Sequence, residues 1–216
     1  MSHRHGPATC PRSGKPVREP TAWSSAWRCD WHGDVHPLRP AFSPSREGLE
    51  GLLRTAGVPA WLPWPLPFGW LVTGFAGAGD ERTGTCASAV ALTGPNPLGG
   101  PGEMLVVAEE PGVGLGAALA GQDGIDPGAG FASAPPAATV SFGKHDFRSG
   151  RSIRPAGPHS RARLRDTGCG SYCGRKPGVL LLEPIRLRDL RDPGQDLDLP
   201  FGAPSPRLPP PDTSQH

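Results

Sequence analysis

The chain has 216 residues, among them 29 prolines and 31 glycines, and a formal net charge of +2. This length allows one domain with its own hydrophobic core and a small appendage, while the proline and glycine content excludes an architecture of long helices. Residues 144–176 carry nine Lys or Arg against two acids, so the rest of the chain is net negative and the overall charge does not indicate a nucleic-acid-binding protein.

No apolar run has the length that a signal peptide or a membrane span requires. The richest stretch, residues 58–75, is interrupted by prolines. The five cysteines form no even framework, which is typical of a reducing compartment where thiols bind metal more often than they pair. We therefore expect a cytoplasmic protein without a membrane partner.

The first chemically informative segment is residues 10–38, which follows a polar leader (residues 1–9) that we expect to be disordered. Two residues separate Cys10 from Ser13, and two separate Cys29 from His32. A two-residue gap lets both side chains of a tight turn face one ion, and two such turns are typical of a ribbon-type zinc site. The spacing predicts a degenerate zinc-ribbon-like knuckle with Cys10, Cys29 and His32 as ligands.

Ser13 occupies the position of the fourth ligand, and a hydroxyl is a poor ligand for zinc. Water or His36 could complete the coordination instead. Two alternatives stay open: a metal-free knuckle held together by packing of Trp23, Trp27 and Trp31, and a catalytic zinc with an open fourth position. No general base lies nearby in the sequence to support the second.

One short helix is predicted over residues 45–57, with Ser45 as the N-cap and Gly57 as the stop. The next run, residues 61–70, carries prolines that forbid helix and favour an extended chain. We interpret its tryptophans as core lining, with an aromatic docking surface as the alternative.

Strand patterns follow. A β-hairpin is predicted from strands at 69–78 and 85–93, joined by a turn that contains Gly and Asp. Cys86 is expected to be a small buried side chain of the second strand. A third strand is predicted at 103–108.

Gly112, Gly114 and Gly116 follow this third strand and resemble a phosphate-binding loop between a strand and a short helix. Glu109 and Glu110 would repel a pyrophosphate, and no βαβ unit can be traced. A nucleotide or acyl-phosphate site at these glycines is therefore the alternative and not the main interpretation.

Beyond residue 178, strands are predicted at 179–182 and 185–190, and residues 196–199 alternate as an edge strand does. The proline-rich stretch 204–211 is expected to be solvated, and residues 209–216 to form a disordered tail.

Five segments together resemble a known family. They are CPR at residues 10–12, CDWHGDVHPL at 29–38, WLPWPLP at 61–67, GPNPLGG at 94–100 and DLRDPG at 189–194. The chain thereby resembles an uncharacterised family of actinobacterial proteins that open with a zinc-ribbon-like pair of turns, over about residues 8–140 and 178–208. The resemblance implies no activity, and it implies that the position of Ser13 is usually Cys.

The resemblance breaks at residues 141–177, where apolar residues nearly vanish and Arg, Gly, Ser and His dominate. The codons of residues 168–174 can be read in a shifted frame, in which the third base of each codon is joined to the first two bases of the next codon. In this frame, GC-rich codons encode an apolar run rich in Leu and Trp. This run leads directly into the apolar residues 179–182, as it does in the family. We interpret 141–177 as read out of frame, so neither its positive charge nor Cys169 and Cys173 is assigned a function.

We therefore expect an α+β, mostly β fold: a zinc-ribbon-like knuckle at 10–38 on one β-rich domain formed by residues 45–140 and 178–208. The expected function is that of a non-catalytic, zinc-binding interaction module with an unidentified protein or small-molecule partner. No catalytic residue is assigned. The alternatives are an acyl or phosphoryl transferase that uses the 112–116 loop, and nucleic-acid binding through the ribbon, which the charge distribution disfavours.

Overall fold

The structure of the chain is a computed structural model that describes residues 7–96, 100–121, 138–142, 145–154, 157–162, 169–175, 186–192 and 198–210; between 138 and 175 it describes the backbone only. In this part of the chain the fold is mostly β with two short helices, as the sequence predicts. Neither helix has the length and apolar character needed to cross a membrane.

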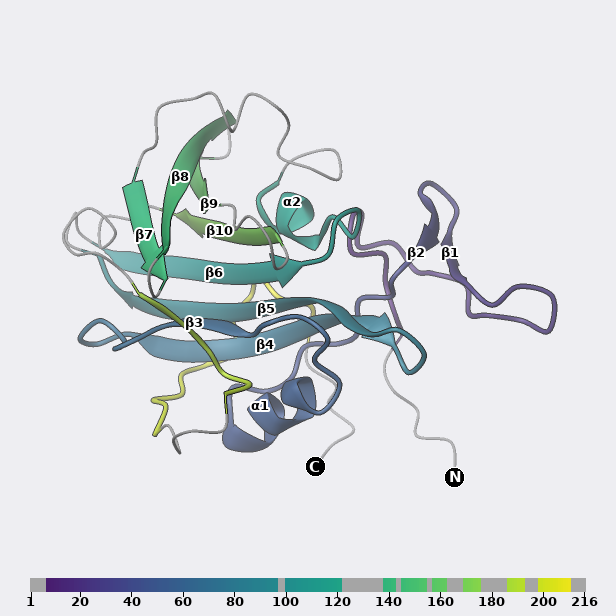
Figure 1. The fold of residues 1–216 in the computed structure, drawn as a ribbon, viewed down its shortest axis with the longest axis horizontal. Helices are drawn as coiled ribbons and strands as arrows, with labels where there is room; N and C mark the ends of the chain where they lie inside the picture. The colour runs from purple at the N-terminus through teal and green to yellow at the C-terminus, as the bar shows by residue number, and fades with distance from the viewer. Residues whose placement is uncertain are drawn as a thin grey trace.

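A four-stranded antiparallel sheet in the order β10-β6-β5-β4 forms the centre of the molecule (Figure 1). The predicted hairpin and third strand are confirmed; β4 lies two residues later than predicted, and β5 and β6 extend slightly beyond their predicted ranges. The four strands are β4 (Leu71–Asp80), β5 (Gly84–Pro95), β6 (Pro101–Glu109) and β10 (Cys169–Arg175).

Both faces of this sheet are covered. On one face, larger side chains of β4, β5 and β6 pack with α1 (Arg46–Leu53), β3 (Trp61–Pro63) and β11 (Leu187–Asp189). The other face is rich in alanine, which lets neighbouring segments approach closely. It buries Cys86 as predicted, together with Leu38, Leu115 of α2 (Leu115–Leu119), and Leu208.

Helix α1 begins as predicted and ends earlier. The Ser45 hydroxyl accepts a hydrogen bond from the Gly48 N–H at 3.1 Å, which is the expected N-cap. The helix ends at Leu53, and Gly57 is not its stop. Instead the Gly57 N–H donates to the Thr85 carbonyl at 3.1 Å, so this glycine belongs to the contact between the α1–β3 connection and β5.

The tryptophan- and proline-rich run lines the core, as the sequence predicts for its tryptophans. Trp61 and Trp70 are buried, whereas Phe68 is 98% exposed. Its first residues form β3, which pairs antiparallel with β11. Trp61 lies opposite Asp189 at one end of this pairing. The strand predicted at 185–190 is thus observed as β11, and the one predicted at 179–182 lies outside the described residues.

The interval 141–177 contributes strands. Strands β7 (Ala138–Phe142), β8 (His145–Arg154) and β9 (Gly157–Ala162) form an antiparallel sheet of their own. Strand β10 pairs with β6 along its whole length, from Cys169 opposite Glu109 to Arg175 opposite Glu103.

Two expectations about the chain ends are wrong where the structure describes them. Ala8 is buried, and the Thr9 N–H donates to the Leu38 carbonyl at 2.9 Å, so these two residues do not belong to a disordered leader. Leu208 is buried against the alanine-rich face, so the 204–211 stretch is not fully solvated. Residues 198–200 form no strand. The chain bonds to β4 around Phe201, where the Val72 N–H donates to the Pro200 carbonyl and the Gly202 N–H donates to the Val72 carbonyl, each at 2.8 Å.

Candidate metal centre

Two turns of the same shape carry the predicted ligands. Cys10 opens the first, in which the Gly14 N–H donates to the Cys10 carbonyl at 2.8 Å. Cys29 opens the second, at the end of β1 (Trp27–Cys29), which pairs with β2 (Gly33–Val35). Each turn ends in a glycine, Gly14 or Gly33, with φ of +67°, a conformation that other residues rarely adopt. The β1–β2 hairpin lies to one side of the central sheet (Figure 1).

The structure brings Cys10, Cys29 and His32 together. Cys10 Sγ lies 3.4 Å and Cys29 Sγ 3.6 Å from His32 Nδ1, and the three atoms lie within 4.8 Å of one another. Zinc bonds of about 2.3 Å to sulfur and about 2.05 Å to nitrogen would place two tetrahedral ligands about 3.6 Å apart. The two sulfur–nitrogen separations therefore match those around one tetrahedral zinc, and the two sulfurs lie within 4.8 Å of each other.

The two sulfurs are buried and the imidazole is exposed. Cys10 is 0% and Cys29 is 3% exposed. Burial acts to raise the pKa of the Cys29 thiol, but the backbone N–H groups of Trp31 and His32 and the side chains of His32 and Cys10 outweigh it. Together they lower this pKa from 9.0 to about 7. Because the thiolate is the form that ligates metal, these contacts prepare Cys29 for coordination near neutral pH.

The fourth corner faces Ser13. Its hydroxyl lies 3.9 Å from Cys29 Sγ, slightly beyond the spacing of two tetrahedral ligands. His36, proposed from the sequence as a possible fourth ligand, is not part of the group that the structure brings together. The described residues thus supply three strong donors and a hydroxyl.

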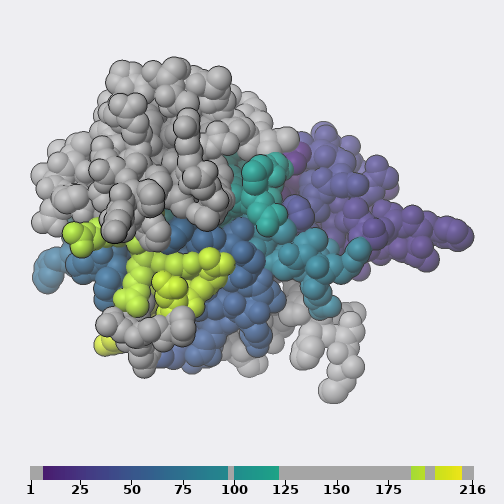
Figure 2. Space-filling view, in the orientation of Figure 1, coloured from purple at the N-terminus to yellow at the C-terminus, as the bar shows by residue number. Residues whose placement is uncertain are grey.

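The expected packing of Trp23, Trp27 and Trp31 that would hold a metal-free knuckle together is not what the structure shows. Trp23 is 98% and Trp31 is 66% exposed, and only Trp27 of the three is buried. The knuckle, residues 8–38, projects from the molecule as a narrow lobe (Figure 2). With so little apolar burial of its own, it depends on other contacts to keep its shape.

Basic side chains attach the knuckle to the sheet. Arg12, in the first turn, donates through Nε to the Val113 carbonyl at 3.2 Å and through Nη2 to the Gly112 carbonyl. Arg82 donates to the Ser25 carbonyl at 2.8 Å. The guanidinium of Arg39 lies 5.1 Å from the Trp27 ring centroid.

The glycine loop is occupied by these internal contacts. Gly114 has φ of +83°, and a Cβ at this position would lie 3.0 Å from Arg12 Cγ. The Gly116 N–H, which a bound phosphate would need, donates to the buried Glu109 carboxylate at 3.2 Å. The loop formed by Gly112, Gly114 and Gly116 therefore receives the knuckle through its carbonyls, and its Gly116 N–H is already engaged where an anion would need it.

The knuckle charges are largely paired. Arg18 forms an ion pair with Asp30, and Arg28 with Asp34 at 3.3 Å. The Lys15 ammonium lies 5.4 Å from the centroid of the Trp31 ring. These contacts leave the knuckle little positive charge to offer a phosphate backbone, which argues against the nucleic-acid alternative.

Comparison with known proteins identifies a family. Residues 4–208 match a family of unknown function (DUF6758). The chain belongs to DUF6758. The matched range of this DUF6758 chain includes the cysteine–histidine group and runs across the interval 141–177. The expected membership in an uncharacterised family is thereby confirmed. No curated protein and no solved structure matches the chain, so no relative of known activity assigns a function to it.

Proposed function

We propose that the knuckle binds one zinc ion through Cys10 Sγ, Cys29 Sγ and His32 Nδ1, and that the protein is a cytoplasmic, non-catalytic interaction module built around it. The observation that carries this proposal is the convergence of the three donors within 4.8 Å, with both sulfur–nitrogen distances close to the tetrahedral value. Two thiolates and an imidazole form a donor set that zinc prefers.

A structural role for the ion follows from what surrounds it. The knuckle buries few apolar side chains, so an ion that joins its two turns would supply stability that packing does not. The nearby acids Asp30 and Asp34 pair with Arg18 and Arg28, and neither belongs to the donor group, so neither is placed as a general base. Cys10, Cys29 and Cys86 are free thiols, which agrees with a reducing compartment.

The exposed aromatic side chains of the knuckle support the interaction role. Trp23 and Trp31 are large aromatic groups that are 98% and 66% exposed, and such side chains are enriched at surfaces that contact partners. We propose that this surface contacts an unidentified protein or small molecule, and that zinc fixes its shape.

The test is the metal content of the purified full chain. The protein is prepared in reducing buffer with zinc in the growth medium, and zinc is quantified by elemental analysis. We expect one zinc per chain in the wild type and in Cys86→Ala, and none in Cys10→Ala or Cys29→Ala. Cys86 is the matched control, because it is a buried thiol outside the candidate site. A metal-free wild type, or full zinc occupancy in Cys29→Ala, would overturn the proposal.

A second measurement locates the effect. Hydrogen exchange of the backbone should accelerate over residues 8–38 when zinc is removed by a chelator, while the strands β4, β5 and β6 keep their protection. Unchanged exchange in the knuckle would contradict the structural role of the ion.

A further inference from the structure

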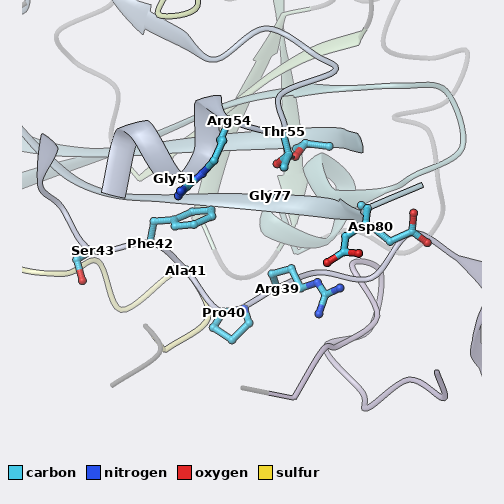
Figure 3. Close-up of a pocket in the computed structure, with 13 residues that line it drawn as sticks. Arg39, Pro40, Ala41, Phe42, Ser43, Gly51, Arg54, Thr55, Gly77 and Asp80 are labelled. Atoms are coloured by element: carbon cyan, nitrogen blue, oxygen red, sulfur yellow. Dashed lines mark hydrogen bonds between the residues drawn. The ribbon is translucent and has the colours of Figure 1, made fainter. Parts of the chain in front are cut away.

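A pocket of 420 Å³ lies away from the metal centre (Figure 3). It opens between the segment 39–43, the C-terminal end of α1 and the tip of the β4–β5 hairpin. Its volume falls in the range of small-molecule sites. None of the three metal-binding side chains lines it.

One wall of the pocket is apolar and depends on a glycine. The Phe42 ring lies against the backbone of α1 at Gly51, where a Cβ would come within 2.8 Å of two ring carbons. Pro40 and Ala41 continue this wall. A ligand with a short apolar body would bury surface here.

The α1 end of the pocket presents hydrogen-bond donors. Arg54 is exposed, and its guanidinium makes no ion pair or hydrogen bond with the described part of the chain. It turns back over Gly51 toward Phe42 (Figure 3), with Nη2 3.7 Å from the place of a Gly51 Cβ. The Thr55 and Thr85 hydroxyls share one hydrogen bond at 2.9 Å, which uses one of their two protons. Guanidinium and hydroxyl groups both donate hydrogen bonds that a carboxylate can accept.

The hairpin end of the pocket presents carboxylates. Asp80 Oδ1 accepts hydrogen bonds from the N–H groups of Arg82 and Thr83, at 3.0 and 2.9 Å. Partial burial acts to raise the pKa of Asp80, but these donors outweigh it and lower the pKa, so the carboxylate stays ionised. Glu81 follows it at the rim. The guanidinium of Arg39 lies at this end too. The Arg82 side chain, outside the lining, also acts on Asp80, so the two carboxylates stand among basic groups and Glu81 at the exposed rim is the acid open to a cation.

We propose that this pocket binds a small zwitterion, with its carboxylate at Arg54 and Thr55, its ammonium at Asp80 and Glu81, and a short apolar body along Phe42. Hydrogen-bond donors at one end and carboxylates at the other favour this class over a simple anion or a simple amine. The proposal is independent of the metal centre, because the pocket shares no side chain with it.

The test is calorimetric titration of the full chain with ω-amino acids of increasing length. We expect saturable binding with an optimum length, and affinities about tenfold lower for the alkyl carboxylate and the alkylamine of the same length. Arg54→Gln and Glu81→Gln should each weaken binding of the best ω-amino acid by a similar factor. Glu50→Gln is the matched control, because Glu50 is an exposed acid of α1 outside the pocket.

The outcomes separate cleanly. Circular dichroism of each variant establishes that it is folded, which is expected because the three substituted side chains are exposed. Absence of saturable binding for every ω-amino acid overturns the proposal. It is equally overturned if the alkyl carboxylate binds as tightly as the zwitterion, or if both pocket variants bind like the control.

Discussion

Ser13 and His32 occupy equivalent places in their two turns. Each lies three residues after a buried cysteine and directly before a glycine with φ of +67°. The backbone therefore places residue 13 where a ligand would stand. What Ser13 lacks is a strong donor atom, because a neutral hydroxyl binds zinc weakly.

A third thiolate at this position should strengthen the metal site. We expect Ser13→Cys to raise zinc affinity by about tenfold or more, since a thiolate replaces a neutral hydroxyl or water as fourth ligand. Competition with a chromogenic chelator measures the change. Ser43→Cys adds a thiol at an exposed position outside the metal group and should leave the affinity unchanged. Equal affinities for the two variants would show that residue 13 does not face the ion.

Asp189 provides a second residue-scale prediction. Its buried carboxylate accepts a hydrogen bond from the Ala60 N–H at 3.2 Å and pairs with the Arg191 guanidinium at 2.7 Å. Asp189→Ala leaves the Ala60 N–H without its partner at the β3–β11 contact. We expect a loss of about 3 kcal/mol in the free energy of unfolding, measured with denaturant. Asp192→Ala removes an exposed acid nearby and should cost less than about 0.5 kcal/mol; similar losses for both would contradict this role.

At the scale of elements, the glycine loop before α2 serves as the socket for the knuckle. Gly112 and Gly114 both have positive φ, but only a Cβ at Gly114 would meet Arg12. An alanine at either position strains the backbone, but only an alanine at Gly114 would also displace Arg12. Comparing the two variants therefore separates the cost of strain from the cost of losing the contact between the knuckle and the loop.

We expect Gly112→Ala to lower the free energy of unfolding by about 1 kcal/mol through strain alone. Gly114→Ala should cost about 1 kcal/mol more, since it also disturbs the two hydrogen bonds of Arg12. Hydrogen exchange over residues 8–38 should accelerate in Gly114→Ala only. Matching exchange rates in the two variants would mean that Arg12 does not hold the knuckle to the sheet.

The elements that could be predicted from sequence are those whose signals are local. The glycines and the aspartate between residues 79 and 84 are typical of a tight turn and predict the β4–β5 hairpin. The Ser45 side chain predicts the start of α1. The ligand triplet was found because each half of it sits within one short turn. The contact of Arg12 with the 112–116 loop could not be found this way, since a hundred residues separate its partners and its acceptors are backbone carbonyls. The same locality explains the resemblance to a phosphate loop: the glycine spacing is the same, and only the folded structure shows that the Gly116 N–H is engaged.

At the scale of the whole molecule, the central sheet is covered on both faces. The sequences of three of its strands are apolar enough for such a position, and that of the edge strand β10 is not. Strands β4, β5 and β6 are almost continuously buried. Strand β10, which pairs with β6 along its length, has the sequence CGSYCGR. Its two glycines weaken a strand, and its serine and arginine are polar residues beside a strand that is almost continuously buried.

The shifted reading frame places its apolar Leu- and Trp-rich run on these same residues, beside β6. We therefore predict that the gene carries a pair of compensating insertions or deletions that flank the codons of residues 141–177, and resequencing the interval tests this. The chain with the frame restored should be more stable, because three additional buried apolar side chains contribute about 5 kcal/mol. For a domain of this size that corresponds to a rise in Tm of about 10 °C or more in a thermal scan. An unbroken frame in the resequenced gene, with no insertion or deletion relative to close relatives, would establish CGSYCGR as the native edge of the sheet.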